Sequence, residues 1–357
     1  MGDRVSYRTA FVGKRALVTG GLGFIGSNLA IRLIEQGASV SIVDSAAPGC
    51  GANPANISAV RDRVRMIPAD ISDARDFAGE IRNCDVIFNL AGEISHTESM
   101  RSPERDLALN ATAQLRFLEV CRRVRPGVRI VFASTRQVYG RPTRLPVNES
   151  HPLEAVDFNG IHKMAAEQYH LLISRLGDID AAIFRLSNVY GPRMALNMPW
   201  QGFMGVYIRA ALLGEPLLVY GDGLQLRDPV FVDDVVDAFL AAGAAKRLPS
   251  RIYNVGGAEP LPLASIAACF AQTGGRSPVR RVPFPAERKA IDIGSCFTDW
   301  SLIRRELGWE PSINILDGAG RTLEYYRRRL GDYIGSRAAQ PRFAVRDAGA
   351  LEPALAR

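Results

Sequence analysis

The sequence predicts an α/β protein built on a Rossmann-type, doubly wound parallel sheet, with a smaller C-terminal domain. Three observations predict this fold. Short apolar runs alternate with helical patterns over the first 190 residues, a glycine-rich turn follows the first run, and prolines become frequent after residue 191. Continuous apolar strands are typical of parallel sheets, because helices cover both faces of such a sheet.

The predicted strands and helices alternate in chain order. Strands are predicted where short runs are rich in β-branched and apolar residues, and helices where apolar residues recur every three or four positions. The strands are 15–19, 39–43, 64–67, 86–90, 129–133 and 181–186, and the helices are 25–36, 105–123 and 160–176. Because a parallel neighbour needs a crossover connection, this alternation predicts one sheet covered by helices.

The domain boundaries follow from changes in this pattern. Residues 13–190 form the first domain, and residues 225–245, a strand and a helix, return to it. Residues 191–334 form mainly the smaller domain, over the carboxyl ends of the strands, where open α/β sheets bind ligands. Residues 335–357 are rich in Ala, Arg and Pro without periodicity, which predicts a disordered tail.

Composition excludes several classes of protein. No apolar run of the 357 residues approaches the ~20 that a membrane helix needs, and the first residues lack the apolar core of a signal peptide. The net charge is +7, but the arginine clusters fall at helix ends and faces, which favours solvated surface over nucleic-acid binding. The five cysteines lack metal-ligand spacing. We expect a cytoplasmic protein that binds no membrane, nucleic acid or metal.

The turn Gly20-Gly21-Leu22-Gly23-Phe24-Ile25-Gly26 joins the first strand to the first helix. Gly20 permits a tight turn, Gly23 lets the backbone approach a pyrophosphate, and Gly26 lets the helix pack closely on the strand. At Phe24 and Ile25 the helix begins, and its free N–H groups favour an anion. This spacing at the start of a βαβ unit predicts a dinucleotide site.

Asp44 ends the second strand, 18 residues after Gly26. A carboxylate at this place accepts hydrogen bonds from the ribose hydroxyls and repels a 2′-phosphate, which favours NAD over NADP. Asp70 and Ile71 follow the third strand and are expected to contact the adenine of the cofactor. The first domain is therefore predicted to bind NAD.

Further motifs follow in order along most of the chain. They are Asn89-Leu90-Ala91-Gly92, residues 133–140, residues 185–192, residues 221–228, Val232-Asp233-Asp234-Val235 and residues 307–311. With the glycine turn they resemble the extended short-chain dehydrogenase/reductase superfamily, in particular its NAD-dependent nucleotide-sugar epimerase/dehydratase family. The resemblance implies that Leu90, Ala91 and Gly92 line the cofactor. It also implies a nucleotide-diphosphate sugar as substrate, a substrate-binding role for the smaller domain, and a homodimer formed by helices 105–123 and 160–176.

The chain departs from this family at its catalytic pair, a Tyr and a Lys four residues later on one helix face. Lys163 matches the Lys, which also contacts the cofactor, and Thr135 matches the catalytic Ser/Thr, but Asn159 stands at the place of the Tyr. An amide does not titrate near neutral pH. Three interpretations follow. In the first, another group moves the proton: Lys163, Thr135 as a relay, His96, or His162, which points away from the catalytic face. In the second, the enzyme catalyses a different reaction that needs no Tyr. In the third, the protein binds a nucleotide sugar but has lost catalysis.

The residues after Thr135 bear on the reaction. Dehydratases of the family carry an acid pair there, whereas this chain has Arg136 and Gln137, which do not protonate a leaving hydroxyl. Arg136 instead offers a fork for a carboxylate or a phosphate, which would suit an acidic sugar.

The resemblance also implies the remaining substrate contacts. Arg227 matches the residue that binds the substrate diphosphate. Other residues assigned to the substrate are Glu93, Arg136, Gln137, Asn188 and Arg288. We expect an isomerase, a nucleotide-sugar epimerase that acts through a transient keto sugar, with C4 as the reacting carbon. The alternatives are a dehydratase or decarboxylase, which are lyases, and a nucleotide-sugar-binding protein without catalysis.

Overall fold

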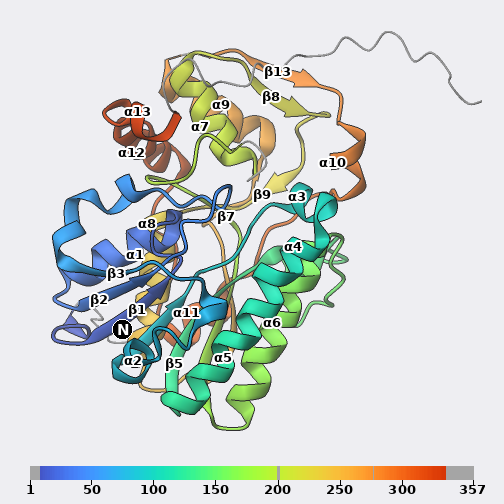
Figure 1. The fold of residues 1–357 in the computed structure, drawn as a ribbon. Helices are drawn as coiled ribbons and strands as arrows, with labels where there is room; N and C mark the ends of the chain where they lie inside the picture. The colour runs from blue at the N-terminus through green and yellow to red at the C-terminus, as the bar shows by residue number, and fades with distance from the viewer. Residues whose placement is uncertain (1–8, 199–201, 276, 335–357) are drawn as a thin grey trace, which may run out of the picture.

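The computed structural model describes residues 9–198, 202–275 and 277–334, which form two lobes (Figure 1). The larger lobe is built on a seven-stranded parallel sheet with the order β11-β6-β5-β4-β1-β2-β3. Its strands are β1 (Arg15–Thr19), β2 (Ser39–Val43), β3 (Val64–Ile67), β4 (Val86–Asn89), β5 (Val128–Thr135), β6 (Ile179–Leu186) and β11 (Ile252–Val255). The chain order runs outward from β1 in both directions, so the crevice for a ligand lies between the loops that follow β1 and β4. The predicted Rossmann-type sheet is confirmed.

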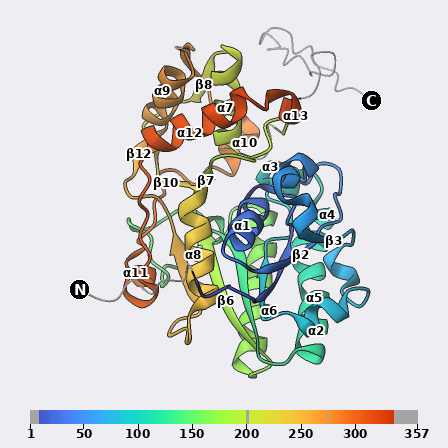
Figure 2. The same cartoon turned by 90° about the vertical axis from the view of Figure 1, so that its left-hand side faces the viewer.

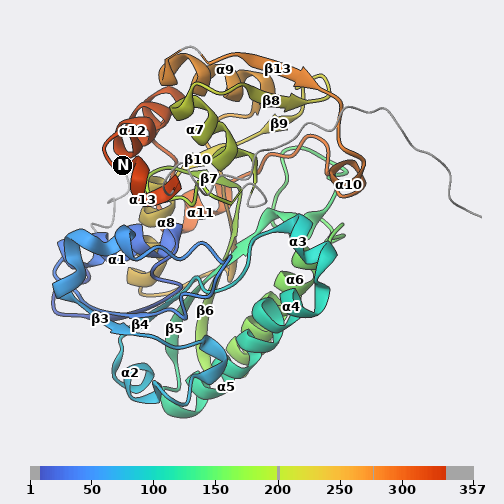
Figure 3. The ribbon, with the colours of Figure 1, turned by 45° about the horizontal axis from the view of Figure 1, so that its top comes forward.

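Helices cover both faces of the sheet because its apolar strands project side chains both ways (Figure 3). Val18 belongs to the core formed with α1 (Phe24–Glu35) and α8 (Val232–Ala244). Its neighbour Leu17 belongs to the opposite core, whose helices are α2 (Ala78–Asn83), α5 (Ala113–Val124) and α6 (Phe158–Arg175). The sheet is therefore buried on both sides.

The predicted helix 105–123 is observed as a more complex element. It begins as α4 (Pro103–Leu107), passes through the π-helical segment η4 (Ala108–Thr112), and continues as α5. The short helix α3 (His96–Arg101) precedes it. Hydrophobic periodicity did not reveal the π-helical segment, because the segment is only five residues long and lies between two α-helical segments.

The smaller lobe lies beyond the carboxyl ends of the strands (Figures 1 and 2). Its helices are α7 (Phe203–Leu213), α9 (Leu263–Gly274), α10 (Ala286–Ala290), α12 (Ile315–Arg327) and α13 (Leu330–Ile334). Its paired strands are β8 (Leu217–Tyr220) with β13 (Val279–Val282), and β9 (Leu226–Arg227) with β12 (Leu261–Pro262). Between the lobes, β7 (Asn188–Tyr190) pairs with β10 (Pro229–Phe231). The 3-10 segments of the larger lobe are η2 (Pro54–Arg63), η3 (Ile71–Asp73) and η5 (Arg136–Tyr139).

The chain returns to the larger lobe over a longer stretch than the predicted 225–245. Helix α8 lies in that range, but β11 and α11 (Ser301–Leu307), which packs on it, lie beyond it. Asp234 connects the return to the later chain. Its carboxylate accepts hydrogen bonds from the backbone of Ser312 and Ile313, at 3.1 and 3.0 Å, and its carbonyl accepts one from Trp309. The motifs at 232–235 and 307–311, far apart in sequence, are thus in direct contact.

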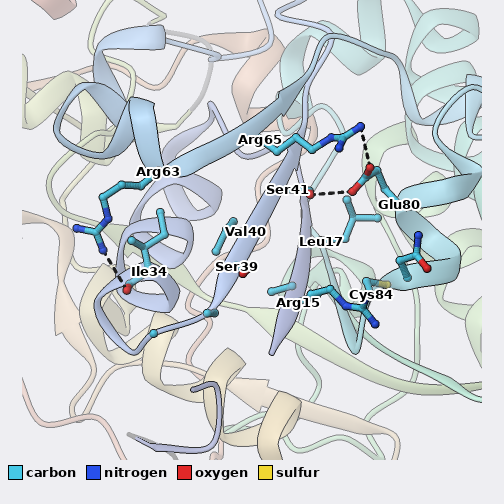
Figure 4. Close-up of a pocket in the computed structure, with 14 residues that line it drawn as sticks. Arg15, Leu17, Ile34, Ser39, Val40, Ser41, Arg63, Arg65, Glu80 and Cys84 are labelled. Carbon is cyan, nitrogen blue, oxygen red and sulfur yellow. Dashed lines mark hydrogen bonds and ion pairs between the residues drawn. The ribbon is translucent and has the colours of Figure 1, made fainter. Parts of the chain in front are cut away.

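The predicted disordered tail, 335–357, lies outside the described residues. Within the described chain, no helix has the length and apolarity to cross a bilayer. A shallow depression of about 530 Å³ lies beside the amino ends of β1 and β2, lined by Arg15, Ser39 and others (Figure 4). There Ser41 and Arg65 both contact the Glu80 carboxylate. This depression is at the opposite strand ends from the glycine turn, so it is not the predicted site.

Candidate functional site

The glycine turn after β1 has the shape that a dinucleotide needs. Gly20 has a φ of +67°, and a Cβ there would lie 2.9 Å from the backbone of Leu90 and Ala91. A Cβ on Gly26 would lie 2.3 Å from the Gly20 carbonyl oxygen. Glycine therefore lets the loops after β1 and β4 touch and lets α1 begin against the turn. At Gly23 no side chain caps α1, and its first turn has no acidic residue, so the first N–H groups suit an anion.

Asp44 lies beside this turn. Its carboxylate accepts hydrogen bonds from the backbone N–H of Leu22 at 2.9 Å and of Ala46 at 2.8 Å. Burial raises the pKa of Asp44, against the effect of these two donors. Asp70 caps the short segment η3 by accepting from Ser72 N, and Ile71 is buried in the core. The adenine contact of these last two residues stays a prediction.

A chain of buried polar side chains fixes the loop after β4. Thr19 Oγ1 donates to Asn89 Oδ1 at 2.8 Å and accepts from the backbone N–H of Leu90 and Ala91. Asn89 donates to Gln114, which donates in turn to the Ala91 carbonyl. The backbone beside the glycine turn is thus held in one conformation.

Gly92 brings that loop against α6. A Cβ at Gly92, whose φ is +150°, would lie 2.9 Å from Lys163 Nζ and 2.6 Å from Asn110 Oδ1. Asn110 stands in the π-helical segment, and its Oδ1 accepts from Glu93 N while its Nδ2 is buried without a described partner. Asn110 is therefore a further candidate site residue, one that was not predicted from the sequence.

Lys163 is a buried titratable group beside Gly92 of this loop. Its side chain is 5% exposed, and Nζ donates to the Ala133 carbonyl at 3.4 Å. Burial lowers the pKa of Lys163 to about 8, although the carboxylates of Asp106, Glu93 and Glu167 oppose the shift. A neutral amine is consequently available near physiological pH, and a neutral amine accepts a proton.

Asn159 lies one turn before Lys163 on the same helix and is buried. Its Nδ2 donates to the Glu93 carbonyl and to Asp106 Oδ2, both at 3.0 Å. The other oxygen, Asp106 Oδ1, lies 2.7 Å from His162 Nδ1. Asn159 therefore anchors a buried carboxylate. Sequence analysis missed Asp106, because a single acidic residue on a helix carries no signal until its neighbours are known.

His96 and Gln137 meet at a single carboxylate rather than at Lys163. His96 Nδ1 lies 3.0 Å from Asp157 Oδ2, which also accepts from Gln137 Nε2 at 2.9 Å. Asp157 caps α6 through Gly160 N at 2.7 Å. Burial alone would raise the pKa of Asp157, but its contacts with His96, Gly160 and Gln137 outweigh burial and lower it. This geometry supports structural roles for His96 and Gln137.

Thr135 and Glu93 are two further predicted residues, at the ends of the loops or strands near Lys163. Thr135 Oγ1 accepts from Gln137 N at 3.1 Å, which leaves its hydroxyl proton free for another partner. Glu93 is buried, and its carboxylate accepts from the backbone N–H of Ile94 and Ser95. Glu93 thus shapes the loop that precedes α3.

Two buried arginines come from different lobes, Arg136 from η5 after β5 and Arg227 from β9. Arg136 Nη2 donates to Asn188 Oδ1 at 3.0 Å, and its Nη1 is buried without a described partner. Arg227 Nη1 donates to the carbonyls of Leu226 and Gly294. Burial, and then the charge of Arg136, lower the pKa of Arg227 to about 10. Arg136, Asn188 and Arg227, which were predicted from the sequence to bind the substrate, therefore lie near one another.

Arg288 stands apart from that group. It lies on α10, and its guanidinium stacks over the Tyr220 ring at 5.6 Å. The same helix contacts α3 through an ion pair between Glu287 and Arg101 at 3.2 Å. The substrate contact of Arg288 stays a prediction.

Comparison with known proteins identifies the family. Residues 16–256 match the model of the NAD dependent epimerase/dehydratase family. The chain is 33% identical to the UDP-glucose 4-epimerase of Mycolicibacterium smegmatis, over 88% of this chain and 99% of that protein. It is 29% identical to the UDP-N-acetyl-alpha-D-glucosaminuronate decarboxylase of Bacillus cytotoxicus, over 89% and 99% of the two chains.

A solved structure agrees with these relatives. The dTDP-glucose 4,6-dehydratase of Streptomyces venezuelae, solved with NAD bound, superposes with a TM-score of 0.80 at 30% identity, covering 89% of this chain and 98% of that one. Relatives of similar likeness thus include an epimerase, a decarboxylase and a dehydratase, so the likeness does not select the reaction. The chain belongs to the NAD-dependent epimerase/dehydratase family and is an NAD-dependent enzyme of the nucleotide-sugar type.

Proposed function

We propose that the protein is a nucleotide-sugar epimerase that acts through a transient keto sugar, with C4 as the reacting carbon. The observation that carries the proposal is Lys163: a buried amine, with a pKa lowered to about 8, beside Gly92 in the cofactor crevice. NAD, when bound, supplies the acceptor and donor of a hydride. The glycine turn, Asp44 and the loop after β4 have the free N–H groups, the carboxylate and the close backbone approach that would bind it.

Lys163 and Thr135 are the residues proposed to move the proton. The neutral Lys163 Nζ accepts the proton of the sugar hydroxyl, with the Thr135 hydroxyl as a relay, and returns it after the sugar has turned over. Thr135 is suited to this role because its Oγ1 is oriented by Gln137 N while its proton remains free. Asn159 orients the surrounding groups and takes no part in proton transfer.

The neighbouring residues favour an epimerase over a dehydratase. Loss of water needs an acid that protonates the leaving hydroxyl. Arg136 and Gln137 follow Thr135 directly, and neither supplies a proton at neutral pH. Arg227 would bind the substrate diphosphate, Asn188 would bind either the same diphosphate or the sugar, and the enzyme would act as a cytoplasmic homodimer.

A decarboxylase is the second candidate, because Arg136 would suit a substrate with a carboxylate. Oxidation of the sugar would precede loss of carbon dioxide, so the same Lys163 chemistry would serve. Mass spectrometry separates the two candidates, since an epimer keeps the mass of its substrate.

The proposal is tested by incubating the purified protein and NAD with a panel of UDP-, GDP-, CDP- and dTDP-sugars, followed by NMR. We expect two isomers of one sugar to interconvert with no net formation of NADH. Absence of conversion across the panel, or products that have lost water or carbon dioxide, would overturn it.

A further inference from the structure

Arg136 carries a buried positive charge that the described protein leaves partly unsatisfied. Its side chain is 8% exposed, and among the described residues its one hydrogen bond is from Nη2 to Asn188 Oδ1. Nη1 is buried and has no partner in that part of the chain. A guanidinium has five N–H donors, and a buried one is normally paired with an anion. Arg136 is therefore organised to receive a group that the protein itself does not provide.

The acidic residues nearby are committed to other partners. No described carboxylate lies within 4.0 Å of Arg136. Asp228 interacts with Arg136 electrostatically, but its oxygens accept from Ser187 Oγ and from the N–H and hydroxyl of Thr298. Asp292 accepts from Gln225 and lies 3.9 Å from Arg227. The unsatisfied donor thus points to an external anion.

The position of Arg136 indicates which part of a substrate that anion belongs to. Arg136 follows Thr135 directly at the carboxyl end of β5, whereas Arg227 lies on β9 of the smaller lobe. If Thr135 faces the reacting sugar hydroxyl, as the proposed function holds, a group bound by Arg136 belongs to the sugar. A planar guanidinium matches a carboxylate with two parallel hydrogen bonds.

We infer that Arg136 binds a carboxylate on the sugar, so that the substrate class is a nucleoside diphosphate hexuronate. This inference rests on the proposed function for the place of the sugar. A neutral hexose would leave the buried Nη1 unpaired, which disfavours its binding. Arg136 is thus the residue that determines specificity.

Calorimetry tests the inference without requiring turnover. The protein with NAD is titrated with UDP, UDP-glucose and UDP-glucuronic acid. We expect UDP-glucuronic acid to bind at least ~10-fold more tightly than UDP-glucose, which is within the range of charge-assisted hydrogen bonds. Equal affinity for the two sugars overturns the inference.

Variants separate the carboxylate from the diphosphate. We expect Arg136→Gln to weaken the binding of UDP-glucuronic acid by ~10- to 100-fold and the binding of UDP by less than ~3-fold. Arg136→Lys keeps the charge without the fork and should recover part of the loss. Arg144→Gln is the matched control, because Arg144 is exposed and bonds only Asn148 and Ser150 among described residues. Circular dichroism checks that Arg136→Gln is folded. If the folded variant binds UDP and both sugars more weakly by the same factor, Arg136 binds the diphosphate and the inference fails.

This failure differs from failure of the proposed function. A preference for UDP-glucuronic acid without any conversion supports the role of Arg136 and overturns the epimerase. Epimerisation of neutral sugars without that preference supports the epimerase and overturns the role of Arg136.

Discussion

Asn159 occupies the place at which this family has its catalytic Tyr, and its contacts give it a different task. Its amide joins the Glu93 carbonyl to the Asp106 carboxylate, which His162 contacts from the other side. A buried carboxylate is costly unless it is hydrogen-bonded, so Asn159 is part of what allows Asp106 to lie next to Lys163. We interpret Asn159 as a positioning residue.

Replacing Asn159 by Tyr tests that interpretation. The larger side chain has no room at a site that is 1% exposed, and the donor to Asp106 is lost. We expect the free energy of unfolding to fall by ~1–3 kcal/mol in urea titrations, with lower activity. Gln272→Tyr is the control, because Gln272 is exposed on α9 of the smaller lobe. Higher activity in Asn159→Tyr at unchanged stability would instead mean that Asn159 is a lost base.

The lowered pKa of Lys163 predicts the pH dependence of turnover. Only the neutral amine accepts a proton, and its fraction grows as pH rises through about 8. We expect kcat to rise with pH through a midpoint at about 8 and to level off above it. Lys163→Arg, whose charge does not titrate, should lower kcat by ~10²-fold or more. A kcat that is flat between pH 6 and pH 9 would contradict the assignment of Lys163 as the base.

At the scale of elements, α6 arranges the site because Asn159, Lys163 and Glu167 recur on its buried face at intervals of four. Glu167 is bound by Arg185 and Ser134, which fixes the helix against β5 and β6. Asp157 sets where the helix begins. The position of this buried face therefore depends on the N-terminal cap of α6.

Loss of that cap is a prediction about the element. Asp157→Ala removes the acceptor for Gly160 N, Gln137 and His96, and we expect ~1–3 kcal/mol less stability in urea unfolding at pH 7. The folded pKa of Asp157 is below its ordinary value of 3.8, so its contribution is present above that pH and is lost as pH falls further. The variant should therefore differ less from wild type in acid. Asp62→Ala, at an exposed position, should change neither quantity.

For the whole molecule, an apolar surface on α4, α5 and α6 favours a dimer. Leu107, Leu115, Ile161 and Leu172 are each 39–49% exposed on these helices, two of which, α5 and α6, pack side by side. We expect light scattering to give twice the 38.9 kDa chain mass. Leu115→Glu with Leu172→Glu should give a folded monomer, whereas Leu224→Glu, exposed in the smaller lobe, should remain a dimer. A wild-type monomer at micromolar concentration would contradict this assembly.

Much of the architecture was predictable from local pattern. The strands at 15–19, 39–43 and 64–67 were predicted with the observed ends, because each apolar run is bounded by turn residues. Strand β11 was not predicted, and its place at the edge of the sheet is fixed by its pairing with β6. The contacts of Asp106, 53 residues from Asn159, depend on how two helices pack, and no spacing along the chain encodes them.

In the proposed reaction, hydride leaves the sugar and returns to it while Lys163 holds the hydroxyl proton. The most direct test follows UDP-glucuronic acid that carries deuterium at C4, incubated with the protein and NAD, by NMR and mass spectrometry. We predict the C4 epimer with its deuterium retained and no net NADH. An epimer that has exchanged its deuterium with water, or a product that has lost water or carbon dioxide, would contradict the account.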